Sequence, residues 1–438
     1  MLFPVVRAAL CATLLLEGCG GRITGDVSHD PRDSTLPPRQ DGGASSVTGD
    51  SSPVHLQGGD DAARPSGSAD ASREAVRGTA DGSIMGDGAV VVSTRPPTNT
   101  GGPSGVLAGQ SGVWVDVTPA GIKLNPKAFP DDNFGVQDVL ADPLHPGTFY
   151  AFVCYQGVWK SEDFGGSWVQ VDTDNNLEQG RPWGEAIAPD GSYMLASTGY
   201  GTARWGAWKS VDHGKTWRKY PIADNSDPYM YDIDPSDSAH VISTSHSTGN
   251  IYESSDGGET WHDRGDTGVG PSGYVFFINR TSWLQVAQSG GGGTLRTTNS
   301  GATWTVVGEM EHVHGGEQIY IDPQTSYIYV PSHSSVNGLF RSTDGGATFT
   351  KVSDLQSAAI VATNTHFYVL DSGATTDSNP PTPTSAPRPA GSPWTSMKAP
   401  AGMTNGAKRA DVAYDSASKR SVIVSGSWNA GIWRYIEP

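Results

Sequence analysis

The sequence predicts an all-β protein: a single seven-bladed β-propeller over residues 109–438, closed by pairing of its N- and C-terminal strands and preceded by a disordered linker. Three observations lead to this prediction. An eight-residue motif recurs five times along the chain. Its copies are spaced by about the length of a four-stranded blade. All 13 Trp residues of the 438-residue chain lie within the region assigned to the propeller.

The repeated motif has the pattern S-x-D-x-G-x-[TS]-[WF] in one-letter code. Its copies cover residues 161–168, 210–217, 254–261, 297–304 and 342–349. The fourth copy is weaker, with Asn299 in place of Asp. Asp, Ser and Thr side chains bond nearby backbone groups in a tight hairpin, and Gly supplies the positive φ that such a turn needs. We expect the closing aromatic residue of each copy to pack between neighbouring sheets.

The spacing of the copies predicts how the ring closes. Their terminal aromatic residues lie 49, 44, 43 and 45 residues apart. A sixth unit contains Trp394 and has a Pro- and Thr-rich insertion over 373–392 in place of the motif. The segment 431–434 resembles the strand before a motif, and the segment 114–117 resembles an outer strand with no blade in front of it. Joining these two segments makes a seventh blade and removes the exposed sheet edges.

Two further segments precede the propeller. Residues 1–19 resemble a secretory signal peptide that ends in a lipobox, in which Cys19 would be acylated. An ordinary cleaved signal peptide is the alternative. Residues 20–108 contain no Phe, Trp or Tyr, so they bury too little apolar surface to offset the entropy cost of ordering, and we predict a disordered linker. The expected location is the bacterial cell envelope, with the protein lipid-anchored or secreted.

Composition excludes several classes of partner. The formal net charge is −17 and no run of basic residues occurs, which argues against a nucleic-acid binder. The three cysteines are Cys11, Cys19 and Cys154. The first would leave with the signal peptide and the second would carry lipid, so no structural disulfide is available. We therefore expect no cofactor, no nucleic acid, membrane contact only through the lipid anchor, and a monomer.

The motif resembles the Asp-box, or BNR, repeat of sialidases, sortilin-type receptors, twin-propeller xyloglucanases and a photosystem assembly factor. The resemblance covers essentially all of residues 109–438 and implies the propeller fold. In these families the box lies on the face away from the site, which implies structural roles for Asp163, Asp212, Asp256 and Asp344. No single catalytic family is matched: the sialidase Arg-Ile-Pro motif is missing, and so is the Asp-bearing N-terminal motif of the xyloglucanases.

Propeller connectivity predicts where a site would lie. The loops that lead into the inner strands share one face with the loops between the second and third strands of each blade. Three carboxylates near the starts of inner strands are the candidate catalytic residues: Asp138, Glu185 and Asp411. If they crowd together at the centre, one pKa rises while a neighbour stays ionised, which acid/base hydrolysis requires.

The candidate substrate-binding residues lie on the same face. They are Trp183, Trp205, Trp428, Arg181, Arg204, Arg409, His246 and His333. We expect these Trp side chains to be exposed and to stack on sugar rings, with polar groups bonding the hydroxyls. His312 and His314 could approach a metal because alternate strand residues share a face. They lack a clear third ligand, so no metal site is predicted.

The preferred hypothesis is a surface-anchored carbohydrate-active or carbohydrate-binding propeller, a candidate glycoside hydrolase acting on a polysaccharide or another glycan. The first alternative is a non-catalytic scaffold that binds protein. The second is a polysaccharide lyase, in which His and Tyr would act with Arg that neutralises a uronate. Exposed Trp side chains near carboxylates would favour the carbohydrate hypothesis, whereas Trp side chains that plug the centre of the ring would favour the scaffold.

Overall fold

The structure is a computed structural model. It describes residues 106–129, 133–174, 176–199, 206–222, 228–270, 273–288, 292–312, 318–333, 336–371, 381–389 and 391–438. All of these residues belong to one compact unit, which spans residues 83–438. The predicted signal peptide and nearly all of the predicted linker lie outside the described residues.

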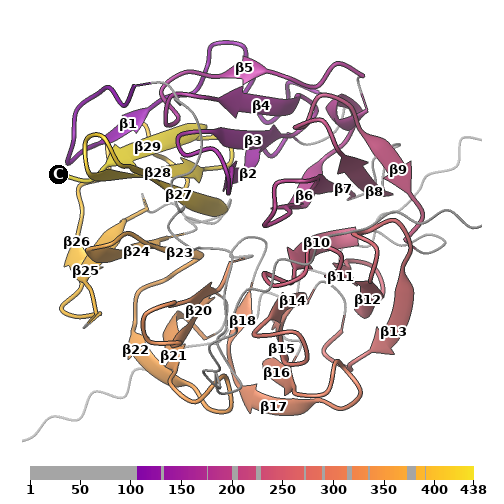
Figure 1. The fold of residues 1–438 in the computed structure, drawn as a ribbon. Coiled ribbons are helices and arrows are strands. Elements are labelled where there is room, and N and C mark those ends of the chain that lie inside the picture. Colours follow the sequence, from indigo (N-terminus) through magenta and orange to yellow (C-terminus); the bar gives the residue numbers. More distant parts are fainter. Residues whose placement is uncertain are drawn as a thin grey trace, which may run out of the picture. The chain divides into compact units, whose positions relative to one another are not determined.

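Seven antiparallel sheets stand around a central axis, each with its first strand innermost, which confirms the predicted seven-bladed propeller (Figure 1). The first blade contains β2 (Val136–Ala141), β3 (Phe149–Val153), β4 (Gly157–Ser161) and β5 (Val169–Gln170). The second contains β6 (Pro182–Ile187), β7 (Met194–Thr198), β8 (Gly206–Ser210) and β9 (Arg218–Tyr220). The third contains β10 (Pro228–Ile233), β11 (Val241–Ser245), β12 (Asn250–Ser254) and β13 (His262–Asp266).

The remaining blades repeat this order. The fourth contains β14 (Tyr274–Phe277), β15 (Trp283–Gln288), β16 (Thr294–Thr297) and β17 (Thr305–Gly308), and β18 (Glu311–His312) pairs with β15. The fifth contains β19 (Tyr320–Ile321), β20 (Ile328–Ser332), β21 (Gly338–Ser342) and β22 (Thr350–Ser353). The sixth contains β23 (Ala359–Ala362), β24 (His366–Leu370), β25 (Thr384–Pro387) and β26 (Thr395–Ser396).

The seventh blade is built from both ends of the propeller, as predicted. It contains β27 (Arg409–Asp415), β28 (Arg420–Gly426), β29 (Ile432–Ile436) and β1 (Trp114–Asp116). The outer strand β1 runs antiparallel to β29, with Trp114 opposite Tyr435 and Asp116 opposite Trp433. Figure 1 shows the two ends of the colour scale meeting in this one sheet. The strand β29 therefore pairs with β28 on one side and with β1 on the other, which closes the ring.

The apolar core lies between the blades. Val139 and Phe149 of the first blade pack with Val422 and Val424 of the seventh. Trp168, the last residue of the first motif copy, is buried in the same cluster, and the first and second blades share a similar cluster. Alternate residues of an inner strand point to opposite sides of its sheet, so each strand contributes apolar groups to both neighbouring interfaces.

Each motif copy forms the hairpin between the third and fourth strands of a blade. In the first copy, Asp163 accepts hydrogen bonds from Gly166 N and Ser167 N, at 2.9 and 2.8 Å, and from the Ser167 hydroxyl at 2.8 Å. The Trp168 indole donates to Gly165 O at 3.2 Å. Hydrogen bonds from the hydroxyl and backbone N–H of Thr348 lower the pKa of the equivalent Asp344 to about 2. These carboxylates therefore serve to build the turn.

The connectivity defines two faces. The turns between first and second strands share one face with the motif hairpins, which we call the box face. The other, the loop face, carries the connections between blades and the turns between second and third strands. Among the described residues the one helix is the short 3-10 helix η1 (Leu177–Gln179). In the same part of the chain, no helix has the length and apolar character needed to span a membrane.

Candidate functional site

Two of the three predicted catalytic carboxylates meet at the centre of the ring. Asp138 lies on β2 and Glu185 on the next inner strand, β6, and neither side chain has any exposed surface. Glu185 N donates to Asp138 Oδ2 at 3.2 Å, and Gly184 N donates to Glu185 Oε1 at 3.1 Å. Register shifts between Val136 and Asp138 and before Glu185 turn both side chains toward this contact.

Two cations from the seventh blade hold Asp138 in its ionised form. Lys408 Nζ lies 3.3 Å from Asp138 Oδ1, and Arg409 Nη1 lies 3.2 Å from Asp138 Oδ2. Arg409 Nη1 also donates to the backbone oxygen of Glu185 at 2.7 Å. Burial alone would raise the pKa of Asp138, but the charges of Lys408 and Arg409 outweigh it and hold the pKa at about 2.

Glu185 has the opposite ionisation. Burial, the negative charge of Asp138 and the hydrogen bond between the two carboxyl groups raise the pKa of Glu185 well above its usual range. Two carboxyl groups can share a hydrogen bond only if one of them carries a proton, and these shifts assign that proton to Glu185. The pair is therefore split into one acid and one carboxylate, although neither is accessible to solvent.

Asp411, the third predicted catalytic residue, has a different environment. Its Oδ2 accepts from Ala141 N, on the inner strand of the neighbouring blade, at 2.8 Å. Asp232 makes the equivalent bond between the third and fourth blades. It lies on β10, and its Oδ2 accepts from Phe277 N of β14 at 2.7 Å. Burial raises the pKa of Asp411 to about 6 and that of Asp232 to about 7. Both carboxylates connect adjacent inner strands.

The expectation that Trp183 and Trp428 are exposed is wrong. Their relative exposures are 2% and 1%. Trp183 stacks on Tyr229 with ring centroids 5.4 Å apart, and Phe134 packs edge-on against both indoles. Lys408 Nζ lies 4.8 Å from the Trp183 ring, so the aromatic layer covers the buried charges. Sequence position alone could not show this, because the contacting residues come from several blades.

Of the remaining predicted binding residues, Arg181 and His246 contact the aromatic layer that contains Trp183, whereas His333 contacts a residue that follows the fifth blade. Arg181 is buried, with its guanidinium over the Phe134 and Tyr155 rings and its Nε donating to the Tyr155 hydroxyl at 3.0 Å. His246 packs on Tyr229, with centroids 4.8 Å apart. His333, in the fifth blade, contacts the Gln356 amide.

Three predicted positions, Trp205, Arg204 and Cys19, lie outside the described residues, as do His314 and Glu317. His312 is buried and its Nε2 pairs with Pro331 O at 2.8 Å. Burial lowers the pKa of His312 to about 4. Within the described ranges, no group of three or more His, Cys, Asp or Glu side chains is arranged to hold a metal ion.

Sequence reasoning missed two buried charged groups at the inner strands. Lys408 is not among the predicted site residues, yet it is fully buried against Asp138. Asp232 was overlooked, although it stands in an inner-strand segment, 228–235, with the same Asp-Pro ending as the segment that contains Asp138. That shared ending was the signal that could have identified Asp232.

The geometry limits the chemistry of the central cluster. Hydrogen-bonded carboxyl oxygens are separated by about 2.5–3 Å. Glycosidases instead need about 5–5.5 Å between two carboxyl groups for retention, or about 6.5–9.5 Å for inversion, so that the sugar and water fit. Asp138 and Glu185 both have no exposed surface, so neither carboxyl group is open to a glycosidic bond in this structure. The cluster is arranged to join the first, second and seventh blades.

Comparison with known proteins supports the propeller fold and does not identify an activity. No family model and no curated protein matches this sequence. Among solved structures, an ancestral GH74 enzyme is similar over 73% of this chain, with 17% identity and a TM-score of 0.51. The chain spans about half of that enzyme, 47% of its length. YCF48 from Cyanidioschyzon merolae has 13% identity, 74% and 99% coverage of the two chains and a TM-score of 0.48. At such identities the likeness shows a shared propeller fold.

Proposed function

We propose that this chain is a non-catalytic binding protein of the Asp-box type, whose propeller holds a protein partner on the loop face. The observation that carries the proposal is the closed centre of the ring. Asp138 and Glu185 have no exposed surface, and Trp183 and Trp428, the indoles that would stack on a sugar, are also buried. The ionisable groups at the centre are used to join blades.

The loop face of the first blade supplies a surface for a partner. Phe129 and Tyr155 are half-buried and their rings contact each other, with centroids 5.1 Å apart. The exposed Lys123 places its Nζ 5.7 Å from the Phe129 ring. Aromatic residues are enriched where protein partners bind.

The loop that carries this surface is held in one conformation. The Gln156 amide accepts from Lys123 N at 2.6 Å and donates to Lys123 O at 3.0 Å. The Asn133 amide donates to Lys123 O at 2.8 Å and to Asn125 O at 3.0 Å. A loop fixed in this way loses little conformational entropy on binding, which favours affinity.

Tyr155 is the residue that best tests this surface. Its φ is 55°, in the left-handed region that favours glycine. Replacing it by Gly therefore removes the ring without opposing the backbone, and such retained strain is a feature of binding sites. The Tyr155 hydroxyl also accepts from Arg181, which fixes the ring in place.

The proposal includes an anchor. A lipid on Cys19 would hold the propeller at the bacterial cell envelope at the end of the predicted linker, which leaves the loop face free to meet a partner. Two features of the sequence support this arrangement. Residues 1–19 end in a lipobox-like motif, and residues 20–108 have the composition of a linker.

The experiment compares binding of the full chain to a peptide array and to a glycan array. We expect signals on peptides that Tyr155→Gly reduces at least tenfold. The matched control is Lys215→Gln, which changes an exposed side chain in a motif hairpin on the box face. Specific glycan binding with no peptide binding would overturn the proposal.

A carbohydrate hydrolase is the second candidate, and one observation favours it. Glu185 is protonated beside an ionised Asp138, the split that acid/base chemistry uses. Release of reducing ends from a panel of polysaccharides, abolished by Glu185→Gln in a variant that still folds, would support the hydrolase and contradict the non-catalytic function.

A further inference from the structure

Two histidines from neighbouring blades meet on the box face, opposite the surface discussed above. His145 lies in the turn between β2 and β3 of the first blade, and His213 lies in the motif hairpin of the second. Their ring centroids are 6.2 Å apart and the ring planes are nearly perpendicular, at 84°. Both are accessible: the His145 side chain is 53% exposed and His213 is exposed.

A buried carboxylate orients the first imidazole. His145 Nδ1 lies 3.1 Å from Asp142 Oδ1, and the Asp142 side chain is only 5% exposed. The same oxygen accepts from Leu144 N and His145 N, at 2.9 and 3.0 Å, which fixes the carboxylate. An imidazole that donates Nδ1–H to a carboxylate presents the lone pair of Nε2 on its other side, and metal-binding histidines are commonly held in this way.

The second imidazole belongs to His213, at a position of the hairpin where some other motif copies have no side chain. His213 has a φ of 61°, and the equivalent residues of the third and fifth motif copies are Gly257 and Gly345. Glycine accepts this conformation more easily than a residue with a side chain. Within the described part of the chain, the His213 ring makes no hydrogen bond, so its nitrogens are not used to build the hairpin.

We propose that His145 and His213 together bind a divalent late transition-metal ion, of which Cu²⁺ would bind most tightly. Nitrogen–metal bonds are about 2.0–2.1 Å, so two imidazoles on one ion have centroids up to roughly 6 Å apart. The observed separation of 6.2 Å is close to this limit, so both exposed rings would have to reorient to bind one ion. Imidazole ligands suit Cu²⁺, Ni²⁺ and Zn²⁺, and affinity at such a site peaks at Cu²⁺. Water would complete the coordination, because the described residues offer no third ligand.

The consequence is a metal bridge between the first and second blades. A ligand that binds the folded chain alone stabilises it in proportion to the logarithm of its concentration. This site is independent of the proposed partner surface, since it lies on the other face. A variant that loses metal binding should therefore still bind the partner, and a variant that loses partner binding should still bind the metal.

The test is a titration of the full chain with Cu²⁺, followed by calorimetry and by electron paramagnetic resonance, which reports nitrogen ligands of copper. We expect His145→Gln and His213→Gln each to weaken binding at least tenfold and to change the signal from two coordinated imidazoles to one. His262→Gln, at an exposed histidine on the outer strand β13, is the matched control and should leave both readouts unchanged.

Folding of each variant is checked by its melting temperature without metal. His213→Gly serves as a second variant, because the positive φ suits glycine and the hairpin should form at least as well. Copper binding that is unchanged in the His145 and His213 variants, or that is altered equally by His262→Gln, would overturn the proposal. So would a wild-type chain with no copper affinity.

Discussion

Glu185 N donates to Asp138 Oδ2 at 3.2 Å across the interface between the first and second blades. Lys408 and Arg409 reach the two carboxyl oxygens of Asp138 from the seventh blade. The contact therefore joins three blades at the point where the last inner strand of the ring meets the first. A cluster of this kind is a closing element, because removing the Asp138 carboxylate would leave the charges of Lys408 and Arg409 without compensation.

Substitutions at this pair should separate a charge effect from a hydrogen-bond effect. Asp138→Asn removes the negative charge that Lys408 and Arg409 face, and we expect it to lower the free energy of unfolding by about 3–5 kcal/mol. Glu185→Gln keeps a donor for Asp138 and should cost under about 1.5 kcal/mol. Urea unfolding at pH 7 measures both. Equal losses in the two variants would contradict the assignment of the proton to Glu185.

The fold was predictable because its signals are local. The hydrogen bonds of Asp163 are all made within five residues, so a short motif predicts the hairpin without knowledge of the rest of the chain. Regular spacing of the motif then predicts the blades, and the unpaired outer strand at Trp114 predicts the closure. Each inference depends on turn chemistry that does not change with tertiary context.

The environment of the candidate site was not predictable in the same way. Trp183 is buried because Phe134, Tyr229 and Trp428, from three other blades, pack around it. Asp138 and Asp411 occupy similar places in their strands, yet a register shift occurs in β2 while the pairing of β27 is regular. A shift of one residue changes the side of the sheet to which a side chain points, and sequence alternation does not reveal it.

The lipid anchor is a proposal that fractionation can test. If Cys19 is acylated, Cys19→Ser should move the protein from the membrane fraction to the soluble fraction when it is expressed in a bacterial host. The reason is that no other contact with the membrane is expected from this sequence. A wild-type protein that is already soluble after fractionation, or a variant that stays with the membrane, would contradict the anchor.

Ring closure predicts that the C-terminal strand stabilises the whole propeller. Deletion of residues 431–438 removes β29, which pairs with β28 and β1 in the seventh blade. We expect one cooperative transition at a much lower temperature, since every blade depends on both neighbours. Deletion of residues 20–105 is the control and should leave the transition in place. Unchanged unfolding of the C-terminal deletion would show that the ring does not depend on this strand.

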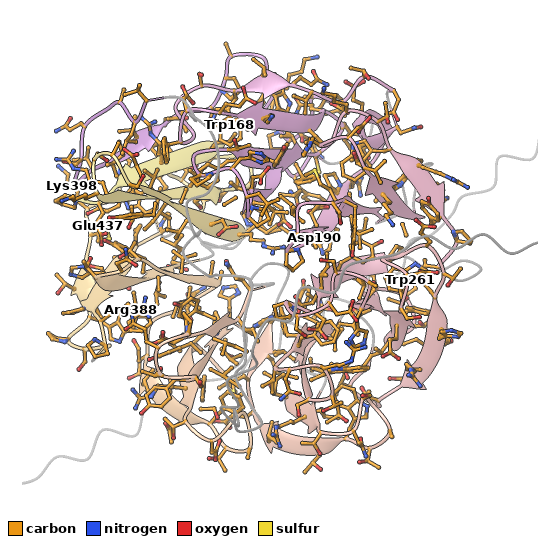
Figure 2. All side chains as sticks on the ribbon, in the orientation of Figure 1. Trp168, Asp190, Trp261, Arg388, Lys398 and Glu437 are labelled. Carbon is orange, nitrogen blue, oxygen red and sulfur yellow. The ribbon has the colours of Figure 1, made fainter. Side chains whose placement is uncertain are left out.

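A single side chain offers a milder test of the same closure. Glu437 Oε1 accepts hydrogen bonds from the hydroxyls of Thr363, Thr365 and Tyr368, at 2.8, 2.6 and 2.9 Å. Figure 2 shows Glu437 at the side of the seventh blade that faces the sixth, which carries Arg388. Glu437→Ala should lower the free energy of unfolding by about 2–3 kcal/mol, because several charge-assisted bonds are lost together. Lys398→Ala, at an exposed side chain between the same two blades, should change it little.

The charged network of the third blade predicts a pH dependence of stability. His240 Nδ1 lies 3.1 Å from Asp234 and its Nε2 lies 2.8 Å from Glu253. Burial would lower the pKa of His240, but its hydrogen bonds to Asp234 and Glu253 outweigh this and raise it to about 9. Because the folded chain holds this proton more tightly than the unfolded chain, the stabilisation is complete below about pH 6.5 and is lost as pH rises toward 9.

His240→Gln isolates this contribution. The difference in the free energy of unfolding between wild type and variant should be about 3 kcal/mol at pH 6 and should shrink steadily up to pH 9. Taking the difference removes other groups that titrate in this range, such as Asp232, whose pKa is raised to about 7. Urea unfolding at half-unit steps of pH measures it, with His262→Gln as the exposed control. A difference that stays constant across the range would show that the folded chain does not hold this proton more tightly than the unfolded chain, and would contradict the charged state assigned to His240.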